Sequence, residues 1–140
     1  MKKRQVVITG AGACGLMAAI MAAREHAHVM ILEKKNRLGK KLLATGNGRC
    51  NFTNKVQKKE CYRGKDANFA WNAMQQFSAE DAIEWFDQIG ILATDKNGYM
   101  YPAANQATVV LHALENELKR QKVEVKLEEA VLSVQKDSKR

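Results

Sequence analysis

The chain has few of the residues that mark secreted, membrane-spanning or metal-binding proteins. Its three cysteines, Cys14, Cys50 and Cys61, are odd in number and widely spaced, so neither a disulfide framework nor a metal site is expected. No apolar run approaches the ~20 residues of a membrane span. Only a short apolar segment separates the basic N-terminus from the first glycines, which does not fit a signal peptide. We therefore expect a cytoplasmic protein with no membrane partner.

The sequence also lacks the side-chain sets of a self-sufficient catalyst. We find no nucleophile triad and no acid/base pair, so no residue is predicted to be catalytic. A chain of 15.7 kDa that is 46% hydrophobic and 27% charged is long enough to bury one core of an α/β domain. Because no residue is predicted to be catalytic, any redox chemistry would have to come from a bound cofactor.

The most informative segment runs from residue 6 to residue 33. A hydrophobic strand at 6–8 leads into the glycine-rich turn GAGACG, and a helix of small residues follows, with Ala18 and Ala22 expected on its sheet-facing side. A second strand at 29–32 then ends at Glu33. This order predicts a complete βαβ unit that binds the ADP part of a dinucleotide.

Each glycine of the turn has a separate expected role. Gly10 makes the tight turn, Gly12 leaves room for a pyrophosphate against the backbone, and Gly15 lets helix and strand touch. The unpaired N–H groups at the helix N-terminus can then bind the anion. We therefore include Ala13 and Cys14, which stand between these glycines, among the expected cofactor contacts.

Glu33 can accept hydrogen bonds from the hydroxyls of the adenosine ribose. A 2′-phosphate would meet its carboxylate at close range, so the sequence favours NAD or FAD. A phosphate loop of the nucleoside triphosphatase type is excluded, because Leu16 and Met17 stand where that motif needs Lys and Ser/Thr. A methyltransferase that binds S-adenosylmethionine remains a lesser alternative.

The segment 38–54, LGKKLLATGNGRCNFTN, is rich in glycine and in amide or hydroxyl donors. We predict a short helix from Lys40 to Ala44, ended by Thr45 and Gly46, and then a loop of residues that tolerate left-handed backbone. Such a loop can wrap a polar ligand. It is equally typical of a surface turn with its own side-chain hydrogen bonds, and the residues alone leave the two open.

At these motifs the chain resembles a known family. GAGACGLMAA, the LEK at 32–34 and above all GKKLLATGNGRCNFTN are similar to the N-terminal part of the bacterial BaiN-like (YhiN-like) flavoproteins. These are NAD(P)/FAD-dependent oxidoreductases, also described as the aminoacetone oxidase family. The GRCNxTN stretch, residues 48–54, is the most specific part of the match.

The resemblance implies that the first βαβ unit holds the ADP half of FAD and that 39–54 runs along the pyrophosphate and ribityl chain toward the flavin ring. It places backbone near Val131 by the adenine and implies NAD(P)H as a reductant of the full-length enzyme. Cys50 is the only thiol in a suggestive place, and we expect it to have a structural role rather than redox exchange with flavin. The side chains and backbone positions carried over from the match as contacts are Lys34, Lys41, Gly48, Arg49, Cys50, Asn51 and Val131.

Family members are roughly three times as long, against a usual domain of about 100–200 residues. We therefore expect 1–140 to be the N-terminal part of one FAD/NAD(P)-binding domain. Its substrate domain and its C-terminal FAD segment would be absent, and the chain alone would be inactive. The sequence does not indicate which small molecule is the substrate, because the domain that would bind it is expected to be absent.

The rest of the chain is expected to have a structural role. Residues 66–105 are expected to form an enlarged connection between strands of a parallel sheet. The apolar residues of 67–77 are expected in the core of one helix, and Ser78 with Asp81 in a capping box begins a second helix that Gly90 ends. The remaining expected elements are a hairpin over 91–101 ended by Pro102, a helix after Asn105, a third parallel strand at 123–127 and a further strand at 131–134.

Charge is concentrated in one segment, residues 34–65, which holds eleven basic residues against the single acid Glu60. Such a segment can be a nucleic-acid surface, a solvated face or an electrostatic funnel for an anionic dinucleotide. Only Phe52 and Tyr62 are interleaved as stacking residues, so we expect no specific nucleic-acid partner.

Together these features predict an α/β, Rossmann-type FAD-binding domain whose parallel sheet is incomplete at the C-terminus. Its function would be to bind FAD within a flavin-dependent oxidoreductase. The alternatives are an NAD-binding dehydrogenase domain and a nucleic-acid-binding module that uses the basic segment.

Overall fold

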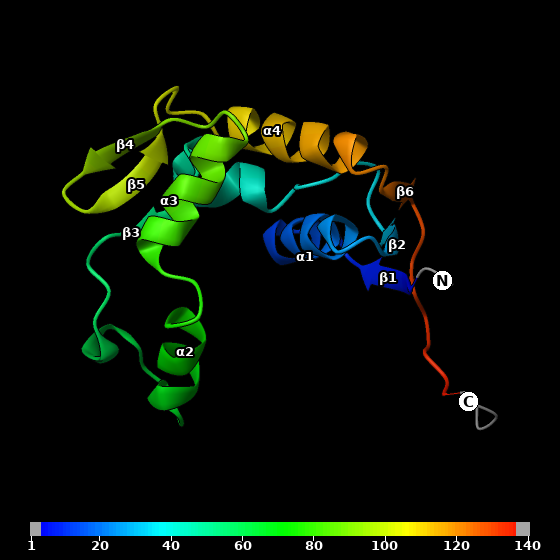
Figure 1. Cartoon of the computed structure of the whole chain (residues 1–140), viewed down its shortest axis with the longest axis horizontal. Coiled ribbons are helices and arrows are strands. Elements are labelled where there is room, and N and C mark those ends of the chain that lie inside the picture. The colour runs from blue at the N-terminus through cyan, green and yellow to red at the C-terminus, as the bar shows by residue number, and fades with distance from the viewer. Residues whose placement is uncertain (1–3, 137–140) are drawn as a thin grey trace. The chain divides into compact units, whose positions relative to one another are not determined.

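The computed structural model describes residues 4–136, which form two compact units (Figure 1). The first unit contains the described residues up to 42 together with those from 114 onward. The second unit is the intervening segment 43–113. Each unit has its own sheet, and each is described separately below.

The first unit is built on a parallel sheet with the strand order β1-β2-β6. The strands are β1 (Gln5–Thr9), β2 (His28–Glu33) and β6 (Glu124–Leu127). Residues 5–9 of β1 lie opposite 28–32 of β2, and residues 30–33 of β2 lie opposite 124–127 of β6. This confirms the predicted Rossmann-type parallel sheet and its third strand.

Helix α1 (Ala13–Arg24) packs against β1 and β2. Its buried side chains are spaced three and four residues apart, as an amphipathic helix on a sheet requires. Ala18 is exposed, so the expected sheet-facing side was one residue out of phase. The side chains of α1 that are buried are Leu16, Ala19, Ile20 and Ala23.

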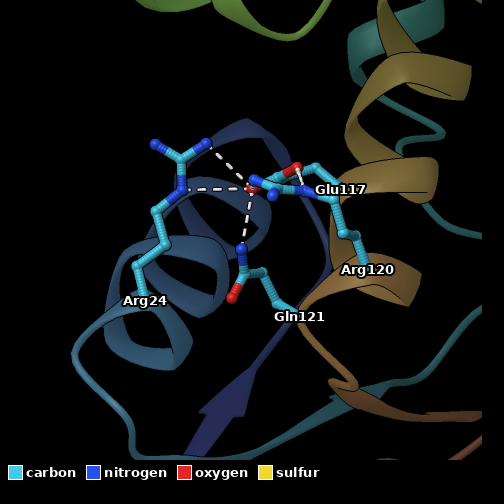
Figure 2. A network of polar contacts seen from close by, with 4 residues as sticks. All are labelled: Arg24, Glu117, Arg120 and Gln121. Carbon is cyan, nitrogen blue, oxygen red and sulfur yellow. Dashed lines mark hydrogen bonds and ion pairs between the residues drawn. The ribbon is translucent and has the colours of Figure 1, made fainter.

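A buried carboxylate joins the end of α1 to the end of α4 (Ala107–Arg120) (Figure 2). Glu117 is 5% exposed, and its Oε1 accepts from Arg24 at 2.8 Å and from Gln121 at 3.1 Å. Its Oε2 accepts from the Nε of Arg120 at 2.7 Å. These hydrogen bonds, led by Arg120, lower the pKa of Glu117 from 4.5 to about 2 against the opposing effect of burial.

In the described part of the chain, β1 pairs only with β2, so β1 is an edge strand. Val7 in its centre is 58% exposed, although the sequence of the strand is typical of a buried one.

The second unit contains an antiparallel sheet with the order β3-β5-β4. The strands are β3 (Thr53–Asn54), β4 (Ala93–Lys96) and β5 (Tyr99–Pro102). The turn between β4 and β5 places Asn97 and Gly98 at φ values of 56° and 88°, as a tight hairpin requires. The predicted hairpin is therefore confirmed.

Helix α3 (Ala79–Gln88) packs beside this sheet and starts with the predicted capping box. The Oγ of Ser78 accepts from the Asp81 amide at 3.1 Å, and the Ser78 amide donates to Oδ2 of Asp81 at 2.7 Å. Phe52 and Phe86 pack with ring centroids 4.6 Å apart. Phe52 is thereby engaged within the unit and is not a free stacking residue.

The expected core role of 67–77 is wrong. Helix α2 spans Ala67–Met74, and no side chain described on it is buried. Phe69 is 76% exposed and Phe77 is 43% exposed. The helix packs against η2 (Lys59–Cys61), and the ring centroids of Tyr62 and Trp71 are 6.1 Å apart. Apolar spacing predicted the helix, but it does not by itself supply a surface to bury that face.

Two further predictions of local structure are wrong. Residues 38–41 form turns, and the helix that follows is η1 (Leu42–Gly48), a 3₁₀ helix interrupted at Thr45, where ψ is 148°. Residues 131–134 form no strand, and Leu132 is 94% exposed. A strand needs a neighbour for its backbone, and none is described beside 131–134. Within the described residues, no helix is long and apolar enough to cross a membrane.

Candidate functional site

The turn between β1 and α1 has the backbone that its glycines were expected to permit. Gly10 has φ +90°, a value that favours glycine, and its amide donates to the carbonyl of Leu32 at 2.8 Å. A Cβ on Gly15 would lie 2.0 Å from the carbonyl oxygen of Gly10, so helix and turn could not approach as they do. The structural roles predicted for Gly10 and Gly15 are therefore present.

Gly12 differs from Gly10 and Gly15, because nothing in the described protein requires a glycine there. Its backbone is extended, with φ −77° and ψ −178°, and a Cβ built on it meets no atom within 4 Å. It caps α1 without any side-chain hydrogen bond to the first turn. The amides of Ala13 and Cys14, both on exposed residues, therefore have no intrahelical acceptor. Open space before free amides fits a pyrophosphate group.

Glu33 lies at the end of β2 and is only 9% exposed. Its Oε2 accepts from the Ala11 amide at 2.6 Å, and its Oε1 accepts from the Lys35 amide at 2.9 Å. The Ala11 bond is the main cause of a lowered pKa at Glu33, and the Lys35 amide and the charges of Lys34 and Lys35 add to it against burial. The carboxylate is thus ionised at neutral pH, and each oxygen keeps a lone pair for a ribose hydroxyl.

A run of cations follows Glu33. All five are exposed, and none forms an ion pair with another described residue. They raise the positive potential close to the glycine turn, which attracts an anionic ligand. The run comprises Lys34, Lys35, Arg37, Lys40 and Lys41.

The segment predicted as a loop from Thr45 onward belongs to the second unit, and its first part, up to Gly48, lies within η1. Gly46 has φ +54°, and a Cβ on it would lie 2.9 Å from the Asn51 amide nitrogen. Gly48 and Cys50 also have positive φ, and the Cys50 amide donates to the Thr45 carbonyl at 3.1 Å. The backbone is therefore left-handed at several positions, as its composition predicted.

One polar atom of this loop is buried without a partner. The side-chain Nδ2 of Asn51 is buried from solvent and donates no hydrogen bond to another described residue. Cys50 is 5% exposed, and burial raises the pKa of its thiol, so it is not a ready nucleophile. Arg49 is exposed. An orphaned amide beside exposed donors fits a loop that binds a polar ligand.

The expected contacts fall on both units. The glycine turn and Glu33 are brought together in the first unit through Ala11, whereas 48–51 lie in the second unit. Val131 is 41% exposed and follows a segment whose Glu129 amide donates to the Glu33 carbonyl at 3.0 Å. The sequence reasoning gave no role to Ala11. It placed Gly39 at the start of the cofactor-binding segment, but it did not predict the bond that the Gly39 amide donates to the Ala11 carbonyl at 2.9 Å. Among the described residues, no cluster could hold a metal ion.

Comparisons with known proteins agree with the Rossmann-type fold. Residues 4–140 match the family model described as HI0933-like protein Rossmann domain. The chain is 48% identical over 123 residues to a 3-dehydro-bile acid delta(4,6)-reductase of Clostridium scindens, which covers 86% of this chain and 30% of that protein. It is 29% identical over 137 residues to the ribosomal RNA dihydrouridine synthase of Escherichia coli, covering 98% of this chain and 34% of that protein.

A solved structure shares the fold. The open conformation of a flavocytochrome c3 fumarate reductase aligns with a TM-score of 0.61 at 19% identity, covering 91% of this chain and 27% of that one. The chain thus spans about a third of the length of the curated relatives it matches.

Proposed function

The chain belongs to the HI0933-like Rossmann-domain family, and from that membership we propose that it binds the ADP half of FAD in a flavin-dependent reductase. The observation that carries the proposal is the glycine turn with its acid. Gly12 leaves open space before free helix amides, and the ionised Glu33 lies at the end of the neighbouring strand. Pyrophosphate and ribose need these two groups in a Rossmann-type unit.

The two curated relatives suggest the reaction class. A delta(4,6)-reductase of a 3-dehydro-bile acid and a dihydrouridine synthase both saturate a carbon–carbon double bond conjugated to a carbonyl. We therefore propose reduction of such an activated alkene. Bound FAD would supply the two-electron redox chemistry that this reduction needs, and NAD(P)H is the proposed source of the electrons for the full-length enzyme.

This chain's own residues would bind and orient the cofactor. Backbone amides of Ala13 and Cys14 would hold phosphate, and the exposed cations after Glu33 would attract it. The contacts proposed for the loop of the second unit are Gly48, Arg49, Cys50 and Asn51. Asn51 supports this proposal, because its buried side-chain Nδ2 has no described hydrogen-bond partner. We propose the reduction of an activated alkene, and a cytoplasmic location, for the whole protein.

Cofactor binding can be tested on the purified chain by calorimetric titration with ADP and with FAD, together with its absorbance spectrum. We expect ADP to bind and to compete with FAD. We expect FAD itself to bind only weakly, because little of this chain would cover the flavin ring. A folded chain that binds neither nucleotide would refute the proposed function.

Nucleic acid is the second candidate ligand, favoured by the basic segment 34–65 and by the relative that carries ribosomal RNA in its name. If the cations serve to attract a dinucleotide, RNA should bind without sequence preference and FAD should displace it. The affinity should fall about tenfold or more between 50 and 200 mM salt. Fluorescence anisotropy would measure this. Tight, sequence-selective binding at physiological salt would instead identify RNA as the ligand.

A further inference from the structure

Ala11 lies between two glycines of the turn, and both of its backbone polar groups form hydrogen bonds within the protein. Its N–H donates to Oε2 of Glu33 at 2.6 Å, and its carbonyl accepts from the Gly39 amide at 2.9 Å. Ala11 is 1% exposed, so neither group has water as an alternative partner. Loss of either partner would leave a buried polar group unsatisfied.

These two bonds continue a series that fixes the start of the turn. The preceding residue, Gly10, donates to the carbonyl of Leu32, the residue before Glu33. The following residue, Gly12, begins α1 and faces the open space. A turn with three glycines in six residues has more conformational freedom to lose than an ordinary one. Contacts from Leu32, Glu33 and Gly39 therefore restrict the backbone before any ligand binds.

Gly39 can make its bond because of its own backbone. Its φ is +61°, the left-handed region that favours glycine, and the residue is buried. It lies in the turn after β2, among the exposed cations Lys40 and Lys41. Its amide donates to the protein, so it is engaged with the turn rather than free to contact a phosphate.

We propose that Glu33 and Gly39 are positioning residues for the phosphate turn, so that Glu33 contributes to pyrophosphate binding through Ala11 as well as to ribose binding through its own oxygens. This inference rests on the proposed binding of ADP. It separates two effects of one carboxylate: direct recognition of ribose hydroxyls, and preorganisation of a turn that does not touch the ribose.

The two effects are separable with 2′,3′-dideoxy-ADP, which keeps the pyrophosphate but lacks both ribose hydroxyls. A Glu33 that only contacts ribose has nothing to lose on this ligand, so Glu33→Gln would leave its affinity unchanged. A Glu33 that holds the turn would lose roughly tenfold in affinity for the dideoxy ligand as well. Calorimetric titration of both ligands to wild type and variants measures the difference.

Gly39→Ala is the second variant, because Gly39 is engaged with Ala11 and has no side chain to reach a ribose. We expect it to weaken ADP and dideoxy-ADP by the same factor. Glu128→Gln is the matched control: it also removes one negative charge near the end of β2, where the Glu128 amide donates to the Lys35 carbonyl. It should change neither affinity by more than about twofold.

The outcomes distinguish this inference from the proposed function. Wild type that does not bind ADP refutes the proposed function itself. Wild type that binds ADP, with dideoxy-ADP affinity unchanged in Glu33→Gln and Gly39→Ala, refutes the positioning role alone. Should the variants fail to fold, hydrogen exchange of the Ala11 amide in nucleotide-free wild type decides. Slow exchange supports a turn held in advance, and exchange as fast as in an open loop overturns it.

Discussion

Gly12→Val should lower the affinity for ADP at least about 100-fold, or by about 2.7 kcal/mol, while leaving the chain folded. The extended backbone at Gly12 accepts a β-branched residue, and a Cβ there meets no protein atom within 4 Å. The valine side chain would instead occupy the space proposed for the pyrophosphate. Calorimetric titration measures the affinity, and circular dichroism confirms the fold.

Gly15→Ala is the contrasting variant at the same turn. Its Cβ would lie 2.0 Å from the Gly10 carbonyl oxygen, so it should lower the melting temperature rather than act on ligand alone. Undiminished ADP affinity in a folded Gly12→Val protein would contradict the assignment of this turn to phosphate.

Glu117→Gln should lower the free energy of unfolding at pH 7 by about 2–3 kcal/mol. The fall in the pKa of Glu117 from 4.5 to about 2 corresponds to about 3 kcal/mol, and the 66% exposure of Arg120 argues for the lower part of the range. The variant leaves Arg24 and Arg120 without their carboxylate. Urea denaturation monitored by circular dichroism gives the difference, and Glu115→Gln on the same helix is the control.

The same carboxylate predicts a pH dependence. Because folding lowers the pKa of Glu117, its stabilisation is fully present above the unfolded value of about 4.5. It should be lost progressively as the pH falls from there through about 2. Wild type and Glu117→Gln should thus converge in stability at acid pH. A gap that stays constant from pH 7 to pH 2.5 would show that Glu117 acts through packing rather than charge.

Local patterns sufficed to predict the first unit because its motif is continuous in the chain. Alternation predicted β1 and β2, glycines predicted the turn, and a carboxylate after the second strand predicted Glu33. The capping box at Ser78 and the Asn-Gly hairpin were also readable, since each is set by residues a few positions apart. The contacts of the candidate site with a ligand remain predictions.

Features that depend on distant residues were not readable. The bond from Gly39 to the Ala11 carbonyl and the partners of Glu117 each join segments far apart in sequence. The exposure of Phe69 has the same origin, because helical spacing says which side is apolar and not what covers it. The valines of 131–134 have strand propensity, but pairing requires a neighbouring strand.

The placement of the second unit within the chain has a consequence for the order of folding. β1, α1 and β2 are contiguous, so their parallel pairing closes only a short loop and can form early. β6 pairs with β2 across residues 34–123, a separation that would carry a large chain entropy if the intervening segment were unstructured. That segment instead contains a compact unit with its own hairpin and helices, which shortens the effective loop. Folding of the inserted unit before β6 docks would therefore accelerate completion of the parallel sheet.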